Sequence, residues 1–333
     1  MSEAVSPVMG ADSVAADTRS SVRLGAVERI GYGVGDFGIN LYFISAMTFL
    51  LYFYTDVLGL TPAAAGGVLL VARLVDAVTD PIMGLLAERT RTRFGRMRPY
   101  IFLGAVPLGV IAVLTFTVPD LDDRGKLIWA YVTYTAFGIA YTVVTIPYST
   151  MTAVLTTDHH ERTLLSTVRM ACAFAGGFVV SVLMLKLVGW FETPAQGFQG
   201  VMIGFAVIAT GCLCLTAAST KERIAPPPTQ HLSVVDSMRA VFINPPLLVV
   251  MVLFTCGMLA FTIRQTVAVY YFEYYLGRGD LIGTFFMVTL SVMLVGLIGV
   301  PKLAARLGKG GSIVAGGLLT ILGCIGMYYT PQD

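Results

Sequence analysis

The chain is 333 residues long, 56% of them hydrophobic and only 13% charged, and its net charge is +2. Soluble domains carry roughly 45–50% apolar and about 25% charged residues, so this composition excludes an ordinary water-soluble fold. The small net charge gives no basis for nucleic-acid binding. Five cysteines and three histidines lack metal-ligand spacing, which excludes a zinc site and a disulfide framework.

The predicted elements begin with a polar, disordered arm over residues 1–28 and continue as a series of apolar stretches. A helix needs about 20 apolar residues to cross roughly 30 Å of hydrocarbon, and only helices satisfy their backbone groups there over that length. The sequence therefore predicts an all-α, polytopic membrane protein. Its nine expected transmembrane helices cover residues 30–54, 62–87, 99–118, 127–150, 166–189, 199–218, 246–275, 281–303 and 312–329.

Basic residues collect in the connection between the second and third spans. The connection after the first span has Asp56 and no basic residue, whereas the next one contains Arg89, Arg91, Arg93, Arg96 and Arg98. Because short connections rich in arginine and lysine stay in the cytoplasm, the N-terminus is predicted to be cytoplasmic.

A polar linker with three consecutive prolines is expected over residues 219–245, between a six-helix bundle at 29–218 and a partial bundle at 246–333. A weak repeat supports this division. The segments at 84–96 and 304–309 share a small–basic–Gly–basic pattern and lie six spans apart. Parallel six-span repeats imply twelve spans, so three helices are expected in addition to these nine.

The second span carries Arg73, Asp76 and Asp80, whose spacing places them on one helical face. Ionisable groups in a span cost about 2.5–3.5 kcal/mol each on insertion scales, so they tend to mark function. Two close carboxylates are relieved by a bound cation or a shared proton, and the hydroxyls of Thr79 and Thr142 suit a hard cation such as Na⁺. The alternative is a structural arginine–aspartate pair.

Other polar residues in the spans are candidates for ligand contact. Arg169 and Arg264 could each hold an anionic group in bidentate fashion or be neutralised by a protein carboxylate. Asn40 and Tyr141 could contact a polar ligand. Asp36 lies near the start of the first span and is expected to contact the arginine-rich connection instead. A Walker A loop is missing from the sequence, which argues against an ATP-driven pump.

Five blocks together resemble the glycoside–pentoside–hexuronide:cation symporters, the melibiose-permease group of the major facilitator superfamily. They are GYGVGD at 31–36, FYTDVLG at 53–59, VARLVDAVTDP at 71–81, RTRTRFGRMRP at 89–99 and IPY at 146–148. The resemblance extends from Gly31 to about Tyr329 and implies the major facilitator fold. It also implies that Asp76, Asp80 and Thr142 bind the coupling cation and that Arg169 contacts sugar.

The chain departs from melibiose permease at two sugar-holding positions. That protein has aspartates where this chain has Asn40 and Thr145. The pattern is more similar to the glucuronide carrier branch, and a site with fewer carboxylates and with Arg169 would tolerate a hexuronide.

The resulting prediction is a cation-coupled symporter, driven by H⁺ or Na⁺, that transports a glycoside or hexuronide by alternating access. The expected cation site is Asp76, Asp80, Thr79 and Thr142, with Na⁺ as the possible metal. The expected sugar contacts are Asn40, Arg73, Tyr141, Thr145, Arg169 and Arg264. A cytoplasmic gate is expected from Asp36, Arg89, Arg93, Arg96 and Arg98.

The expected partners are a small sugar and the lipid bilayer, without nucleic acid, and the expected state is a monomer. The expected location is a bacterial inner membrane, and no cofactor or enzymatic activity is expected. The alternative is a membrane sensor or regulatory protein that keeps the transporter fold without transporting.

Overall fold

The computed structural model describes residues 24–224, 242–278 and 281–329. The chain divides into two compact units, Met1–Pro227 and Pro228–Asp333. The predicted arm lies outside the described residues up to residue 23, and the predicted linker does so from 225 to 241.

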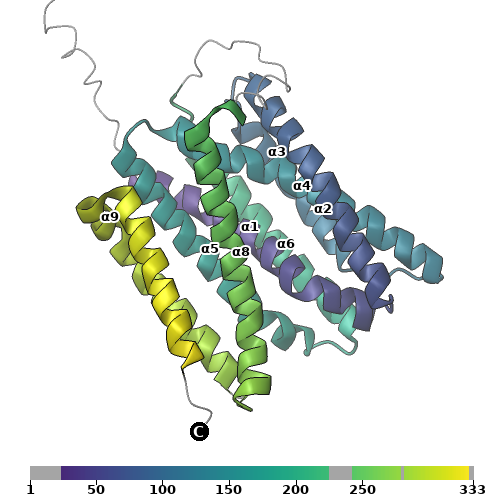
Figure 1. Ribbon diagram of the computed structural model, residues 1–333. Helices are drawn as coiled ribbons and strands as arrows, with labels where there is room; N and C mark the ends of the chain where they lie inside the picture. The colour runs from purple at the N-terminus through teal and green to yellow at the C-terminus, as the bar shows by residue number, and fades with distance from the viewer. Residues whose placement is uncertain (1–23, 225–241, 279–280, 330–333) are drawn as a thin grey trace, which may run out of the picture. The chain divides into compact units, whose positions relative to one another are not determined.

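The first unit contains six long helices, drawn from purple to teal in Figure 1. They are α1 (Ala26–Tyr52), which continues as the π-helical turn η3 (Phe53–Val57), α2 (Pro62–Arg89), α3 (Arg98–Thr115), α4 (Asp123–Leu155), α5 (His159–Val188) and α6 (Pro194–Ser219). Helices α2, α4 and α6 begin with side-chain caps. The oxygens of Thr61, Asp122 and Thr193 accept the amide N–H groups three residues further along.

Helix α1 packs against α5 and α6, α3 packs against α4 and α6, and α2 packs against α4. Glycines permit the close approach of α1 and α5. A Cβ added at Gly33 would lie 2.6 Å from Val168 Cγ1, and one at Gly176 would lie 2.7 Å from the Phe37 carbonyl oxygen. Small residues at such crossings allow the van der Waals packing that holds helices together in lipid.

The short segment 220–224 after α6 fastens the ends of three other helices, and we call it the α6 clasp. Glu222 accepts the amide N–H groups of residues 96–98 at the start of α3, at 2.8, 2.8 and 3.1 Å. The amides of Arg223 and Ile224 donate to the Val154 carbonyl oxygen at the end of α4. Arg223 also forms a two-pronged pair with Glu28 of α1, at 2.6 and 2.8 Å. This hydrogen-bonded carboxylate raises the pKa of the Arg223 guanidinium.

The second unit contains α8 (Pro245–Tyr270), the π-helical turn η4 (Tyr271–Tyr275) and α9 (Leu281–Tyr328). Helix α9 is two helices joined at Gly308, whose backbone angles are φ 71° and ψ 171°. Glycine is suited to this conformation because it has no Cβ. The Tyr271 hydroxyl donates to the Met327 carbonyl oxygen at 2.8 Å, so η4 is joined to the end of α9.

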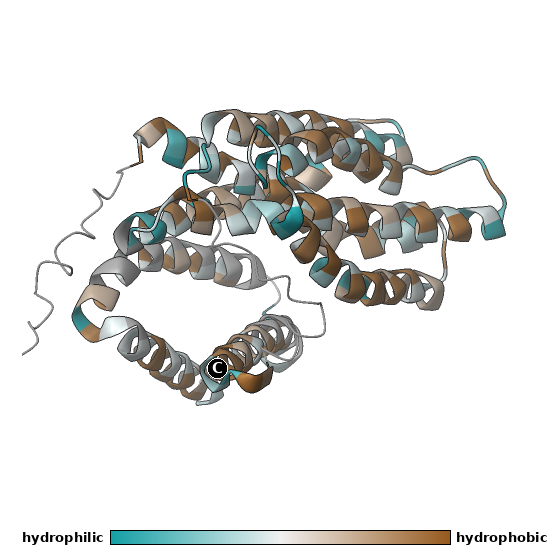
Figure 2. Ribbon diagram, turned by 90° about the horizontal axis from the view of Figure 1, so that it is seen from above, coloured by the Kyte–Doolittle hydropathy of each residue, from teal (hydrophilic) through white to brown (hydrophobic). Residues whose placement is uncertain are grey.

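The prediction of an all-helical membrane fold is confirmed. Each of the nine predicted spans overlaps a helix, and the described residues contain no strand beyond one isolated bridge between Thr92 and Gly95. Within the described ranges, six helices are long and apolar enough to cross a membrane. Helix α2, which carries the charged residues Arg73, Asp76, Asp80, Glu88 and Arg89, is not among the six. Figure 2 shows apolar residues along the helices and most hydrophilic ones near helix ends and connections.

Candidate functional site

The charged face of α2 lies against α4. Arg73 Nη1 is 3.2 Å from Asp76 Oδ2, and Arg73 Nη2 donates to the Tyr134 hydroxyl at 2.9 Å. One turn along α2, Asp80 Oδ1 accepts a hydrogen bond from the Thr142 hydroxyl at 2.7 Å. The structure therefore brings Asp80 and Thr142 together across the two helices, as the resemblance implied.

The two oxygens of Asp76 have different surroundings. Oδ2 faces Arg73, whereas Oδ1 is buried and has no hydrogen-bond partner among the residues that the structure describes. Oδ1 also lies against the α4 backbone, because a Cβ added at Gly138 would be only 2.6 Å from it. A buried carboxylate oxygen without a partner is costly and calls for an explanation such as an ion or a proton.

A small cavity of about 30 Å³ adjoins Asp76. About 10–15 Å³ of such space is enough to hold one water molecule, so the cavity has room for a water or a small cation. The lining comes from α1, α2 and α4 and consists of Phe43, Ala46, Met47, Ala72, Arg73, Asp76, Tyr134, Phe137, Gly138 and Tyr141.

The oxygen donors at α2 suit a hard cation or a proton. They are the unpartnered oxygen of Asp76, the carboxylate of Asp80 and the hydroxyl of Thr142. Thr79 is less well placed, because its hydroxyl donates to the Asp76 backbone carbonyl oxygen at 3.4 Å. In the described part of the chain, no group of three or more His, Cys, Asp or Glu side chains could hold a metal.

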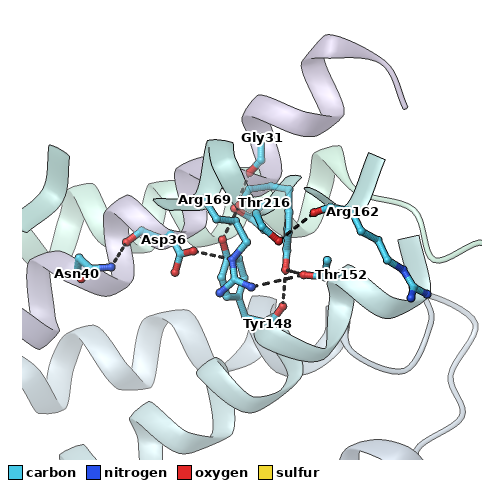
Figure 3. A network of polar contacts seen from close by, with 10 residues as sticks. Gly31, Asp36, Asn40, Tyr148, Thr152, Arg162, Arg169 and Thr216 are labelled. Atoms are coloured by element: carbon cyan, nitrogen blue, oxygen red, sulfur yellow. Dashed lines mark hydrogen bonds and ion pairs between the residues drawn. The ribbon is translucent and has the colours of Figure 1, made fainter. Parts of the chain in front are cut away.

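A second polar cluster joins α1, α4 and α5 (Figure 3). Arg169 Nε donates to Asp36 Oδ2 at 2.6 Å, and its Nη1 donates to the Thr152 hydroxyl at 3.4 Å. The guanidinium carbon also lies 4.8 Å from the centre of the Tyr148 ring and 5.5 Å from that of Tyr32. Arg169 is thus held by a carboxylate, a hydroxyl and two aromatic faces.

The two tyrosines tie α1 to α4 reciprocally. The Tyr148 hydroxyl donates to the Tyr32 carbonyl oxygen at 2.7 Å, and the Tyr32 hydroxyl donates to the Tyr148 carbonyl oxygen at 2.9 Å. Both side chains are almost fully buried. This arrangement fixes the aromatic surfaces on which Arg169 rests.

One face of α1 connects the two clusters. Asp36, Asn40, Phe43 and Met47 are spaced by four, three and four residues, so they lie in one row. Asp36 belongs to the Arg169 cluster, whereas Phe43 and Met47 line the cavity beside Asp76. Phe43 also stacks on Tyr141, with ring centres 6.2 Å apart.

Of the remaining predicted sugar contacts, Asn40 and Thr145 form hydrogen bonds within their own helices. The Asn40 amide donates to the Asp36 carbonyl oxygen at 2.8 Å, and the Thr145 hydroxyl donates to the Tyr141 carbonyl oxygen at 2.9 Å. Both bonds are to the residue's own helix. Arg264 belongs to α8, and its side chain lies outside the described residues.

Asp36 was predicted to contact the arginine-rich connection, but in the described part of the chain its carboxylate is held by α5. Asp36 pairs with Arg169 instead, because the close crossing of α1 and α5 brings the guanidinium to the carboxylate. The predicted gate arginines make other contacts. Arg93 lies over the Phe94 ring at 4.7 Å, and Arg98 Nε donates to the Ala217 carbonyl oxygen at 2.7 Å.

Sequence reasoning missed Thr152 and Gly138 of these clusters and Glu222 of the α6 clasp. Thr152 and Glu222 make hydrogen bonds to partners far away in the sequence, so neither showed a local signal. Gly138 was missed as well, although its position one turn before the implied cation ligand Thr142 was a usable signal.

Comparisons with known proteins show which family the chain is similar to. A family model described as "MFS/sugar transport protein" matches residues 31–333. The chain is 36% identical over 317 residues to the "Uncharacterized symporter YnaJ" of Bacillus subtilis, covering 93% of this chain and 68% of that protein. It is 35% identical over 301 residues to the "Isoprimeverose transporter" of Lactiplantibacillus pentosus, covering 89% and 63%. It is 42% identical over 198 residues to the "Putative glycoside/cation symporter YagG" of Escherichia coli, covering 59% and 43%.

Proposed function

Because the chain belongs to the MFS/sugar transport protein family, among the glycoside–pentoside–hexuronide:cation symporters, we propose that it takes up a glycoside or hexuronide together with a cation. Members of this family are membrane transport proteins and not enzymes. The chain spans 68%, 63% and 43% of the three relatives, so the activity of the whole protein is part of the proposal.

The observation that carries the proposal is the buried, unpartnered Oδ1 of Asp76 one helical turn from the Asp80–Thr142 pair. Pairing with Arg73 accounts for only one oxygen of Asp76, because the other oxygen is buried without a hydrogen bond. A cation, either Na⁺ or H⁺, would satisfy it. The names of two relatives, a glycoside/cation symporter and an isoprimeverose transporter, support a sugar as cargo.

In this proposal Asp76, Asp80 and Thr142 hold the cation, and Asn40, Tyr141, Thr145 and Arg169 face the sugar. Transport would follow alternating access between two bundles around a midplane site. The arginine-rich connection at 89–98 would form part of the cytoplasmic gate. The protein would act as a monomer in a bacterial inner membrane, with its N-terminus in the cytoplasm.

Substitution of Asp80 by Asn tests this function. Vesicles from cells that express the complete gene are given an Na⁺ or H⁺ gradient and labelled sugars. We expect gradient-driven uptake by the native protein and uptake at the level of empty vesicles for Asp80→Asn, because the amide cannot carry the carboxylate's charge. The matched control is Asp56→Asn, at an exposed position in the connection between α1 and α2. Equal uptake by Asp80→Asn and the native protein would remove Asp80 from the coupling site.

A further inference from the structure

Two apolar hollows follow one another along the seam between α3 and α6. The first, of about 470 Å³, lies where α3 begins and α6 ends, and the second, of about 430 Å³, lies further along both helices. Every fourth residue of α3 lines one of the two, in the order Arg98, Phe102, Val106, Val110 and Leu114. Residues spaced by four form one ridge of a helix, so the two hollows are parts of one groove, which we call the α3–α6 groove.

Small residues leave this groove open. Ala217 and Ala218 line it at the end of α6, and Gly109 lies beside Ala206 further along, where a Cβ added at the glycine would be 3.6 Å from the Ala206 Cβ. Large apolar side chains also line it, and one of them, Leu103, is 70% exposed. In a membrane an apolar surface of this kind lies against acyl chains, which are as apolar as leucine. The groove therefore suits a lipid tail.

Charge is found at one end of the groove. Among the described residues that line it, Arg98 alone is charged. Its Nε donates to the Ala217 carbonyl oxygen at 2.7 Å, which holds the guanidinium at the groove and leaves its two terminal nitrogens without a hydrogen bond to the described residues. The exposed Arg93 belongs to the same arginine-rich connection. This end of the groove is therefore complementary in charge to an anionic headgroup.

The length of the groove fits one lipid tail. A helix rises 1.5 Å per residue, so about ten residues of α3 span about 15 Å, which is roughly half the hydrocarbon thickness of a bilayer. Counted from Arg98, these residues end at Leu108, next to Gly109 of the second hollow. A tail whose headgroup meets Arg98 thus passes Phe102 and Val106 and reaches the middle of the bilayer within the groove.

We propose that the α3–α6 groove binds one anionic glycerophospholipid, whose phosphate pairs with Arg98 and whose tail lies along the seam. An arginine fork can hold two phosphate oxygens at once. Basic pockets between transmembrane helices are typical sites for anionic headgroups. The lipid contacts both helices and so stabilises their packing. The site shares no residue with the clusters around Asp76 and Arg169, so the proposal goes beyond the proposed transport function.

Two lipids with the same tails and different headgroup charges test the proposal. The full-length protein, purified in detergent, is titrated with dioleoylphosphatidylglycerol or dioleoylphosphatidylcholine, and bound lipid is counted by native mass spectrometry. We expect one phosphatidylglycerol to bind with an affinity about tenfold or more above that of phosphatidylcholine, because several arginines lie near the headgroup and each contributes about fivefold. Equal affinities for the two lipids would overturn the proposal.

An arginine variant assigns the headgroup contact. Arg98→Gln should lower the affinity for phosphatidylglycerol by about fivefold, the factor expected for one basic residue at an anionic headgroup. The matched control is Arg124→Gln, which removes the same charge at an exposed position in the first turn of α4 and should leave the affinity unchanged. An unchanged affinity in Arg98→Gln would contradict the proposed headgroup contact.

A filled groove separates this site from attraction by surface charge alone. Ala218→Trp retains every arginine but occupies the groove, and it should lose most of the bound phosphatidylglycerol. The control Val132→Trp adds the same ring at an exposed position of α4 and should bind as the native protein does. Native affinity in Ala218→Trp would refute the groove. A native protein that is a dimer without lipid and a monomer as Ala218→Trp would place a second copy there instead. If a variant does not fold, the native comparison of the two lipids decides.

Discussion

At the scale of single residues, the informative feature is the asymmetry of Asp76. A salt bridge whose arginine is 57% exposed contributes little to stability, so the contact with Arg73 alone is a weak reason for a carboxylate in a span. Its other oxygen is buried without a partner in the described structure and lies against the α4 backbone at Gly138. The position of that oxygen depends on the absence of a side chain at residue 138.

Substitution of Gly138 by Ala is expected to weaken cation coupling. The added methyl would lie 2.6 Å from Asp76 Oδ1, which is closer than real Cβ contacts, so the carboxylate must move. Misplacement of a functional group by about 1 Å can cost on the order of a hundredfold. We expect the cation concentration for half-maximal uptake to rise by about tenfold or more.

The control for this substitution is Gly84→Ala on α2, where an added Cβ meets nothing within 4 Å in the described part of the chain. Its half-saturating cation concentration should match that of the native protein. An unchanged value in Gly138→Ala would show that the position of Oδ1 does not matter for coupling.

Local spacing explains which residue contacts could be predicted. The Arg73–Asp76 pair joins positions three apart on one helix, so the sequence alone was enough to raise it as an alternative. Thr142 was expected beside the span-two carboxylates both as a hydroxyl suited to a hard cation and through the family resemblance, and its hydroxyl is hydrogen-bonded to Asp80. The Asp36–Arg169 pair joins residues 133 positions apart and depends on where α1 crosses α5, which no local pattern contains.

At the scale of elements, helix α3 has an unusual start. Its cap residue Met97 provides no side-chain hydrogen bond, and Glu222 from the α6 clasp satisfies the first amides instead. Gly95, with φ +107°, supports this arrangement, because a Cβ there would collide with the Glu222 carboxylate. Glu222 of the clasp therefore caps the N-terminus of α3, a role that a Ser, Thr or Asp next to the helix has in other helices.

Substitution of Glu222 by Ala is expected to lower the thermal unfolding temperature of the purified protein. Loss of a capping side chain costs about 1–2 kcal/mol, and each kcal/mol corresponds to about 2–4 °C for a unit of this size. Glu222→Gln retains an acceptor oxygen and should fall between Ala and the native protein. The exposed Glu192→Ala serves as control and should leave the midpoint unchanged. If Glu222→Ala unfolds at the same temperature as the native protein, water replaces the carboxylate as hydrogen-bond acceptor without loss of stability.

Helix boundaries were predicted well where the length of an apolar stretch and a capping residue define them. They were predicted less well where contacts with other helices define them. The capped starts of α2 and α4 fall at or a few residues before the predicted ones. Residues 220–224 were expected to belong to a linker, yet they pack against the first unit. The π-helical turns η3 and η4 were not anticipated, because a single extra residue in a helical turn leaves no mark on an apolar pattern.

At the scale of the whole molecule, the distribution of arginine predicts how the chain crosses the membrane. The five arginines of the connection at 89–98 are expected on the cytoplasmic side, and Asp56 on the opposite side. Asp56 and Arg93 are both exposed, so reagents in solution can reach either position.

Labelling of single cysteines tests this orientation. In a background in which the five native cysteines are replaced by serine, Asp56→Cys should react with a membrane-impermeant maleimide in intact cells. Arg93→Cys should react only after the membrane is permeabilised. The reverse pattern would invert the predicted topology, and the gate proposed for the arginine-rich connection would then face the wrong compartment.

The α6 clasp also bears on the order in which the first unit can be completed during synthesis. Its residues follow all six long helices of that unit, yet they provide hydrogen-bond partners for the beginnings of α1 and α3 and for the end of α4. A chain emerging from the ribosome can insert its early spans one after another, as domains generally form from the N-terminus onward. The hydrogen bonds of the amides at the start of α3 and of the Glu28 carboxylate cannot form until residues 220–224 have been synthesised. The first unit therefore acquires its final hydrogen bonds only after α6 has left the ribosome.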